Sequence, residues 1–408
     1  MDQFLQIMES YKGSILYHNL LQVELKRSDA IPAEVLNKEK ALKQSLAAYI
    51  TRLNNNPAPE DIKDLQERII SLEVKISRLQ KQYEKYPEFE EYKRQSDAAV
   101  ITIDFIQEKL DRQTAVISFI YSSSHIYGIA ITHNDVLVHR IDADSSLDKH
   151  LDYFLSALYE HSNGKRYDGY KSSAVIYDRL IAPFLTVISD KPRWVILPDG
   201  KLNYMPFNAL QEKEAQRHYL GENKIISNHY SLQLLFNNDK TLKAGTEKPF
   251  IFAPFIAEGA ENKANLLPAL FSSAAEVAAF NGYSFTKDKA TKANFLAFAD
   301  KASVIHLSTH AMADFDSVNK ACIFFYPSDT DDLGTKLYAP EIYNLDLQNT
   351  QLVILSACET AFGRNVTGEG LLSLTRGFLY AGSDGVISTF WKTDDRVSAY
   401  IMQQLHKY

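Results

Sequence analysis

The sequence has 408 residues, 45% of them hydrophobic and 23% charged, which is enough for more than one hydrophobic core. Its 44 basic and 51 acidic side chains give a formal charge of -7, a balance that predicts neither a nucleic-acid partner nor an anionic membrane partner. The first residues lack a secretion signal, and no apolar run reaches the roughly 18 residues of a membrane-spanning helix, so we expect a cytoplasmic protein.

Residues 1–97 are rich in Glu, Lys, Gln and Leu and poor in Gly, a composition that favours long helices. Residues 54–59 (NNNPAP) interrupt them and permit an antiparallel return. We therefore predict a coiled-coil hairpin that serves either as a structural arm or as a docking arm for an activating protein partner. Its two apolar stripes are Leu42, Leu46, Tyr49 and Leu53, then Leu65, Ile69, Leu72, Ile76, Leu79 and Tyr83.

From residue 98 the pattern changes to short β-branched and aromatic runs between turns, interleaved with helical segments, which predicts an α/β domain. Strands are expected at 114–121, 125–132, 136–141 and 193–197, with a helix at 147–161. A second set of strands and helices follows, with strands at 250–253, 303–310, 321–326, 352–358 and 385–389 and helices at 272–281, 292–298 and 371–381.

Two apolar runs of this second set each lead directly into a residue suited to nucleophilic chemistry. One run ends at His310 and the other at Cys358, 48 positions later. The carboxyl ends of buried parallel strands meet at the crevice where α/β proteins bind their ligands, so we expect both side chains there. A thiol becomes a strong nucleophile when a nearby base takes its proton, and His310 is the candidate base.

The remaining candidates for site chemistry have structural interpretations. Only two cysteines occur, so no disulfide framework is predicted, and Cys322 lies in an unbroken apolar run that is typical of core packing. His306 is expected to be a hydrogen-bonded structural histidine, because a four-residue spacing to His310 suits a metal site only on a helix. The loop with Gly368 and Gly370 lacks the Lys-Ser/Thr ending of a phosphate loop. No metal or other cofactor is expected.

Several motifs together resemble the CHAT domain, a caspase-like and separase-like family of cysteine peptidases. They are residues 197–210 (LPDGKLNYMPFNAL), 305–310 (IHLSTH), 355–363 (LSACETAFG), 368–378 (GEGLLSLTRGF) and 391–395 (WKTDD). The likeness covers residues 98–408. It implies a caspase-like three-layer α/β/α sandwich with a pseudo-peptidase half (98–248) and a catalytic half (249–408), preceded here by the all-α helical hairpin.

The resemblance also implies a reaction and its residues. Cys358 and His310 form the catalytic dyad of an endopeptidase that hydrolyses a protein substrate, in a signalling or defence pathway under the control of a partner. The backbone amides of Ala311 and Cys358 hold the oxyanion. Asp394, Asp395 and Glu359 are candidates for binding a basic substrate side chain, and helix capping explains the two aspartates equally well.

The sequence departs from the family pattern in places. Ser-Ala-Cys-Glu-Thr replaces the caspase pentapeptide around the cysteine, Ala311 stands where glycine often follows the histidine, and the arm lacks a tetratricopeptide pattern. The end at Tyr408, within an expected helix, is compatible with a fragment.

The alternative interpretation is a catalytically silent scaffold with the same fold. Self-cleavage in the loops at 258–264 and 328–334 is a lesser alternative.

Overall fold

The computed structural model describes residues 2–10, 12–27, 31–54, 57–89, 101–162, 164–213, 218–236, 248–256, 267–314, 318–327, 334–357, 360–361, 363–366, 369–391 and 393–407. Cys358 and Glu359 lie outside these residues, as do the loop at 258–264 and nearly all of the loop at 328–334. The chain forms two compact units. The first comprises residues 1–17, 97–239 and 365–371, and the second comprises residues 18–96, 240–364 and 372–408.

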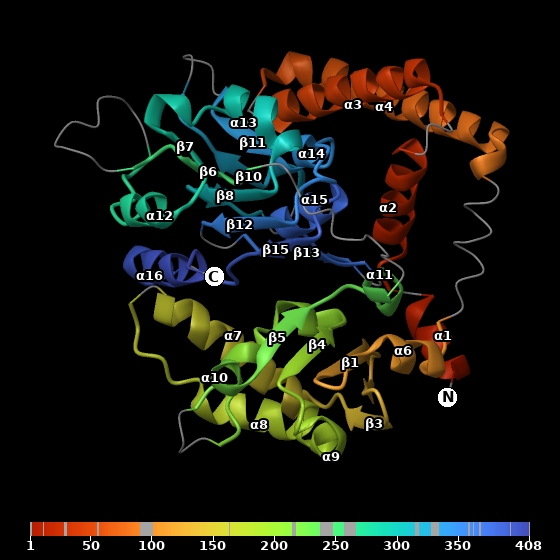
Figure 1. Ribbon diagram of the computed structural model, residues 1–408, viewed down its shortest axis with the longest axis vertical. Helices are drawn as coiled ribbons and strands as arrows, with labels where there is room; N and C mark the ends of the chain where they lie inside the picture. The colour runs from red at the N-terminus through yellow and green to blue at the C-terminus, as the bar shows by residue number, and fades with distance from the viewer. Residues whose placement is uncertain are drawn as a thin grey trace. The chain divides into compact units, whose positions relative to one another are not determined.

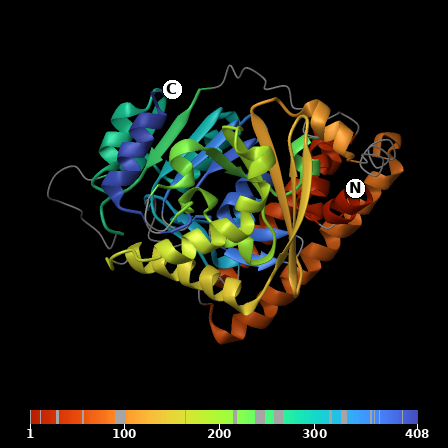
Figure 2. The same ribbon diagram turned by 90° about the horizontal axis from the view of Figure 1, so that it is seen from below.

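A five-stranded mixed sheet forms the centre of the first unit, in the order β3-β2-β1-β4-β5. Its strands are β1 (Thr114–Tyr121), β2 (His125–Ile131), β3 (Val136–Asp142), β4 (Arg193–Leu197) and β5 (Ile225–Asn228). The first three form the antiparallel meander predicted from the sequence, seen in Figure 2, while β1, β4 and β5 run parallel. The predicted bounds of β1 and β4 are confirmed.

Helices cover both faces of this sheet because alternate residues of β1 enter two different cores. Ala115, Ile117 and Phe119 belong to one core and Val116 to the other. The helices are α1 (Asp2–Glu9), α6 (Ile103–Lys109), α7 (Ser145–Ser162), α8 (Tyr170–Leu180), α9 (Leu185–Ile188), α10 (Leu220–Asn223) and α11 (Leu232–Phe236), with 3₁₀ turns η2 (Ala182–Phe184), η3 (Gly200–Tyr204) and η4 (Phe207–Ala209).

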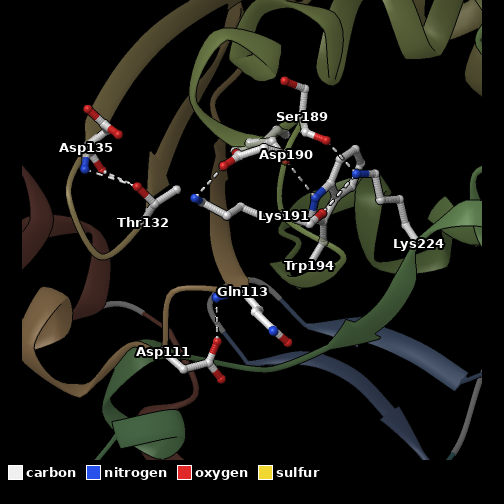
Figure 3. A network of polar contacts seen from close by, with 10 residues as sticks. Asp111, Gln113, Thr132, Asp135, Ser189, Asp190, Lys191, Trp194 and Lys224 are labelled. Atoms are coloured by element: carbon white, nitrogen blue, oxygen red, sulfur yellow. Dashed lines mark hydrogen bonds and ion pairs between the residues drawn. The ribbon is translucent and has the colours of Figure 1, made fainter.

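Two lysines of the first unit donate hydrogen bonds to backbone carbonyls. Lys224 donates to the carbonyls of Ser189 and Lys191, and its ammonium lies 5.1 Å from the ring centre of Trp194 (Figure 3). Lys12 is buried and donates to Ser118 Oγ and to the carbonyl at the end of β4, at 2.9 Å each. Burial lowers the pKa of Lys12 to about 8.

All strands of the main sheet in the second unit are parallel, in the order β15-β12-β8-β6-β7. They are β6 (Phe250–Ala253), β7 (Tyr283–Thr286), β8 (Val304–Ser308), β12 (Leu352–Ser356) and β15 (Gly385–Ile387). The predicted bounds of β6 are confirmed, and the strands expected to reach His310 and Cys358 end before those residues. Near-continuous burial of β6 and β8 is what a parallel sheet covered on both faces requires.

The remaining elements of the second unit surround this sheet (Figure 1). The helices are α12 (Ser273–Ala279), α13 (Lys292–Phe298), α14 (Ala339–Ile342), α15 (Leu374–Tyr380) and α16 (Asp395–Leu405), with 3₁₀ turns η5 (Lys287–Lys289), η6 (Ala299–Lys301) and η7 (Val318–Lys320). A small antiparallel sheet consists of β9 (Ala311–Met312), β10 (Cys322–Phe324) and β11 (Lys336–Tyr338). Cys322 is fully buried in it, as its apolar surroundings predict.

The predicted helical hairpin is also part of the second unit. Helix α2 (Ser14–Arg27) precedes it, and α3 (Ala33–Asn54) and α4 (Pro59–Gln80) lie side by side, followed by η1 (Lys81–Lys85). The predicted break at 54–59 coincides with the end of α3 and the start of α4. Asn54 and Asn344 tie α3 to the α/β part through hydrogen bonds with the carbonyls of Asn319 and Lys43.

One predicted helix begins later than the sequence pattern indicated. Residues 371–381 were expected to be helical, whereas Gly370–Ser373 is strand β14, which pairs with β13 (Gly363–Val366) ahead of α15. Gly363 permits this pairing, because a Cβ there would meet the carbonyl oxygen of Leu372 at 1.9 Å. The turn contains Gly370 at φ +75°, a conformation that glycine adopts without strain.

Candidate active site

The carboxyl ends of β8 and β12 lie side by side because the two strands are parallel neighbours. Ser308 at the end of β8 pairs in register with Ser356 at the end of β12. The pairing continues past the strands, since the Thr309 amide lies 3.4 Å from the Ser356 carbonyl oxygen. His310 follows Ser308 by two residues, and position 358 follows Ser356 by two. The described residues that lead to the two predicted dyad positions therefore lie side by side at one edge of the sheet.

The ring of His310 is half-buried and is held by Phe255, two residues after β6, and by the carbonyl of Pro268. Its Nε2 lies 2.8 Å from the carbonyl oxygen of Pro268, and its ring centre lies 5.1 Å from that of Phe255. A carbonyl oxygen can only accept, so Nε2 carries the proton and donates it. In the neutral imidazole Nδ1 then has the free lone pair, which is the arrangement a general base needs.

Pro268 is itself positioned by the chain that directly follows β6. The Leu270 amide donates to the Phe255 carbonyl at 2.9 Å, and Ile256 and Leu270 form an isolated β-bridge. These bonds fasten the segment that carries Pro268 to the chain directly after β6. No residue pattern pointed to this carbonyl, because a backbone acceptor is independent of residue type.

The segment that contains Cys358 is anchored on both sides by threonines. Thr389 Oγ1 donates to the Ala357 carbonyl at 2.8 Å, and the Thr389 carbonyl accepts from the Ala361 amide at 3.0 Å. Thr375 on α15 donates to the Thr360 carbonyl at 3.2 Å. The described residues on either side of Cys358 are therefore each held by hydrogen bonds from a neighbouring element.

The backbone of Ala311 is placed to offer its amide as a donor. The His310 carbonyl accepts from the Phe324 amide at 3.0 Å, which makes this pair a hydrogen-bonded pair of the β9–β10 ladder. In an antiparallel ladder the next pair, Ala311 with Ile323, is non-hydrogen-bonded, so its amide groups point away from the partner strand. The Ala311 N–H is thus directed away from β10.

A family model described as the CHAT domain matches residues 171–408, more than half of the chain. The chain belongs to the CHAT family. The match includes both dyad positions and begins within α8, so it does not include the β1–β3 meander. No curated protein matches the chain. Among the residues that the structure describes, no helix is both long and apolar enough to cross a bilayer.

One face of the CHAT sheet carries a buried polar cluster directly below the two strand ends. Ser308 Oγ donates to Ser273 Oγ at 2.8 Å, and Ser356 Oγ donates to Glu276 Oε1 at 3.0 Å. Ser273 and Glu276 lie one turn apart on α12, so a single helix contacts the last residue of both strands. Glu276 is only 1% exposed.

His306 extends this cluster to the end of α16. It is fully buried, its Nε2 lies 2.8 Å from Glu276 Oε2 without being aligned for a hydrogen bond, and its Nδ1 lies 2.9 Å from His406 Nε2. The expectation of a structural histidine with partners is confirmed. Burial and the neighbouring His306 lower the pKa of His406 to about 4, so His406 is neutral at physiological pH.

The two aspartates predicted for substrate binding both bond to backbone amides. Asp394 is the N-cap of α16, where its side chain accepts from the amides of Arg396 and Val397, and these bonds lower its pKa. Asp395 Oδ2 accepts from the Ser272 amide at 2.8 Å, which ties α16 to the start of α12. Within the described residues, no group of three or more His, Cys, Asp or Glu side chains is arranged to hold a metal ion.

Proposed function

We propose that this CHAT protein is a cysteine endopeptidase in which Cys358 is the nucleophile and His310 is the general base. The observation that carries the proposal is the register of β8 and β12, which pairs Ser308 with Ser356, the residues two positions before His310 and Cys358. The hydrogen bond from His310 Nε2 to Pro268 O supports it, because that bond leaves Nδ1 as the proton acceptor.

The proposed reaction proceeds through an acyl-enzyme. His310 Nδ1 accepts the thiol proton, the sulfur attacks the scissile carbonyl carbon, and a tetrahedral oxyanion forms. The amides of Ala311 and Cys358 donate to that oxyanion. His310 then returns the proton to the leaving amine and the C–N bond breaks. Water attacks the thioester as His310 takes its proton, the C–S bond breaks to release the carboxyl product, and His310 returns the proton to the sulfur.

Pro268 adds a third member to the proposed dyad. When His310 becomes an imidazolium, its Nε2–H continues to donate to the carbonyl oxygen, so the ring keeps its orientation throughout the cycle. A neutral carbonyl stabilises the imidazolium less than a carboxylate does, which suits a thiol because it is more acidic than a serine hydroxyl.

Substrate recognition is part of the same proposal. We assign Asp394, Asp395 and Glu359 to a basic side chain of the protein substrate. Capping and tethering already use Asp394 Oδ1 and Asp395 Oδ2, which leaves each aspartate one further oxygen for this role. Replacing Asp395 with Asn should preserve the tether through the amide oxygen and reduce the preference for Lys or Arg in a peptide library.

A second function, partner binding by the helical arm, is favoured by one observation. The outer side of α4 exposes Ile62, Ile70 and Val74 at 37%, 59% and 43% of their surface, at helical spacing. Such a stripe suits an apolar helix of an activating protein. In a silent scaffold of this fold, the stripe would operate without the dyad.

The test uses two cysteine variants of the full chain. Cys358→Ala should abolish cleavage of a candidate protein substrate and labelling by an electrophilic peptide warhead, with the melting temperature unchanged. Cys322→Ala is the matched control, because Cys322 is buried in β10, and it should lower stability while retaining both activities. Absence of warhead labelling at Cys358, with and without cell lysate, would replace the peptidase proposal with the scaffold.

A further inference from the structure

The last residues of the two strands that lead to the dyad are held by the same helix in matching ways. Ser308 and Ser356 each stand two residues before a dyad position and pair with one another in register. Each hydroxyl donates to a side chain of α12, Ser308 to Ser273 at 2.8 Å and Ser356 to Glu276 at 3.0 Å. One turn of α12 therefore holds the ends of both strands.

The same segment also orients the base. Pro268, five residues before Ser273, accepts from His310 Nε2, and Ser272 is tied to α16 through Asp395. The chain from Pro268 to Glu276 thus contacts the base directly and the strand of the nucleophile through Ser356. A shift of this segment would change the position of His310 relative to residue 358.

Glu276 is the member of this set whose burial needs an explanation. A carboxylate at 1% exposure is costly unless other groups compensate it, and Ser356 and His306 are the polar side chains that contact it. His306 in turn contacts His406 at the end of α16. The carboxylate is therefore fixed from two sides, which gives its bond to Ser356 a defined direction.

We propose, on the basis of the proposed function, that Glu276 is a positioning residue. Through its contact with Ser356 it fixes the end of β12, which leads to Cys358, relative to the end of β8, which leads to His310. It does not touch the substrate or the reacting atoms. Its loss lets the end of β12 move relative to β8, so that His310 withdraws the thiol proton less effectively. The expected effect is a change in the reactivity of the Cys358 thiol, which can be measured in the absence of substrate.

The experiment measures alkylation of Cys358 by iodoacetamide as a function of pH, with peptide mapping by mass spectrometry to separate it from Cys322. Relative to the unmodified chain, His310→Ala should raise the pH midpoint of Cys358 alkylation by about one unit or more, toward that of a free thiol. Ser356→Ala and Glu276→Ala should each raise it by roughly half a unit to one unit, and the double variant should shift no further than either single one.

Conservative variants and a matched control separate positioning from general stability. Ser356→Thr and Glu276→Gln keep the hydroxyl and the acceptor oxygen, so both should restore the original midpoint. Ser383→Ala removes another buried hydroxyl bond of the same unit, to the Phe378 carbonyl, and should lower the melting temperature without moving the midpoint.

The outcomes distinguish the two proposals. If His310→Ala leaves the midpoint unchanged, the dyad itself is wrong. If His310→Ala raises it while Ser356→Ala leaves it unchanged, the dyad stands and the positioning role of Glu276 is refuted. Ser356→Ala settles the question even where Glu276→Ala fails to fold, because it leaves the contact between Glu276 and His306 in place.

Discussion

The side chain of His310 is oriented by a main-chain oxygen, a choice that shapes how the site is encoded. A carboxylate partner would have been visible in the sequence as an Asp or Glu, whereas the Pro268 carbonyl is supplied by any residue that the loop places there. The orientation of the proposed base therefore depends on the loop conformation, which Leu270 and Phe255 fix through a backbone hydrogen bond. If the proposal holds, mutations that disturb this loop should make His310 a less effective base without altering any ionisable group.

Gly363 offers a direct test of the pairing between β13 and β14. In Gly363→Ala the new Cβ would lie 1.9 Å from the Leu372 carbonyl oxygen, so β13 and β14 must separate, and we expect a loss of about 2–3 kcal/mol of unfolding free energy. Gly385→Ala, whose Cβ would meet its nearest atoms at 3.7 Å, is the control and should cost under about 1 kcal/mol. Urea denaturation measures both. Equal losses would contradict the close approach.

His406 predicts a dependence of stability on pH. Its pKa is about 4 in the folded protein and 6.5 in an unfolded chain, so between these values the unfolded chain binds more protons and stability falls as pH decreases from 6.5 toward 4. Because the residue is half-exposed, we expect a loss of about 1 kcal/mol over this window. In urea titrations at pH 7 and pH 5, His406→Gln should show a smaller decrease than the unmodified chain. His139→Gln, on the exposed face of β3, should follow the unmodified chain. Parallel behaviour of all three proteins would remove His406 as the cause.

At the scale of elements, the apolar stripe of α4 was readable because helical spacing reports which side chains point inward, whereas Leu42, Leu46, Tyr49 and Leu53 of the predicted α3 stripe are only partly buried. Leu65, Leu72, Ile76 and Leu79 of α4 are buried. The parallel strands were readable for a similar reason, since burial on both faces requires continuous apolar runs. The strand at Gly370–Ser373 was not, because its four residues continue the apolar pattern of α15 and only the Gly363 contact distinguishes them.

The same distinction between inner and outer sides of α4 predicts a contrast between two alanine variants. Leu72→Ala leaves a cavity between α3 and α4 and should cost about 2–4 kcal/mol. Ile70 is 59% exposed, so Ile70→Ala should change the free energy of unfolding by less than about 0.5 kcal/mol. Chemical denaturation followed by circular dichroism measures both changes. A large effect at Ile70 would show that this face is covered in solution.

The candidate site was only partly predictable from the sequence. The meeting of the β8 and β12 ends, which lead toward His310 and Cys358, followed from the sequence, because topology places the carboxyl ends of neighbouring parallel strands together. Glu276 and Pro268 lie far from both along the chain and are brought near by α12 and by the bridge to β6. Contacts of this kind depend on the packing of a helix against the sheet, which periodicity does not report.

At the scale of the whole molecule, the helical hairpin is part of the second unit rather than an appendage. Helix α3 contacts α14 and η7, and Asn54 and Asn344 bond across this contact. Deletion of residues 33–85 should therefore expose apolar surface of the α/β part, lower its melting temperature and cause aggregation. Light scattering during a thermal ramp measures this. A deletion variant that melts at the original temperature would show that the arm is dispensable for stability.

The path of the chain between the two units has a consequence for fragments. Residues 1–17 and 365–371 belong to the unit formed by residues 97–239, while the chain on either side of 365–371 belongs to the other unit. Glu369 accepts from the Ile15 amide, and Asn365 donates to the Gly200 carbonyl, so these distant stretches are fastened within one unit. A protease that nicks the chain once between residues 237 and 248 would leave two polypeptides that still share both units. They should migrate as one band in a native gel and separate only after denaturation in detergent.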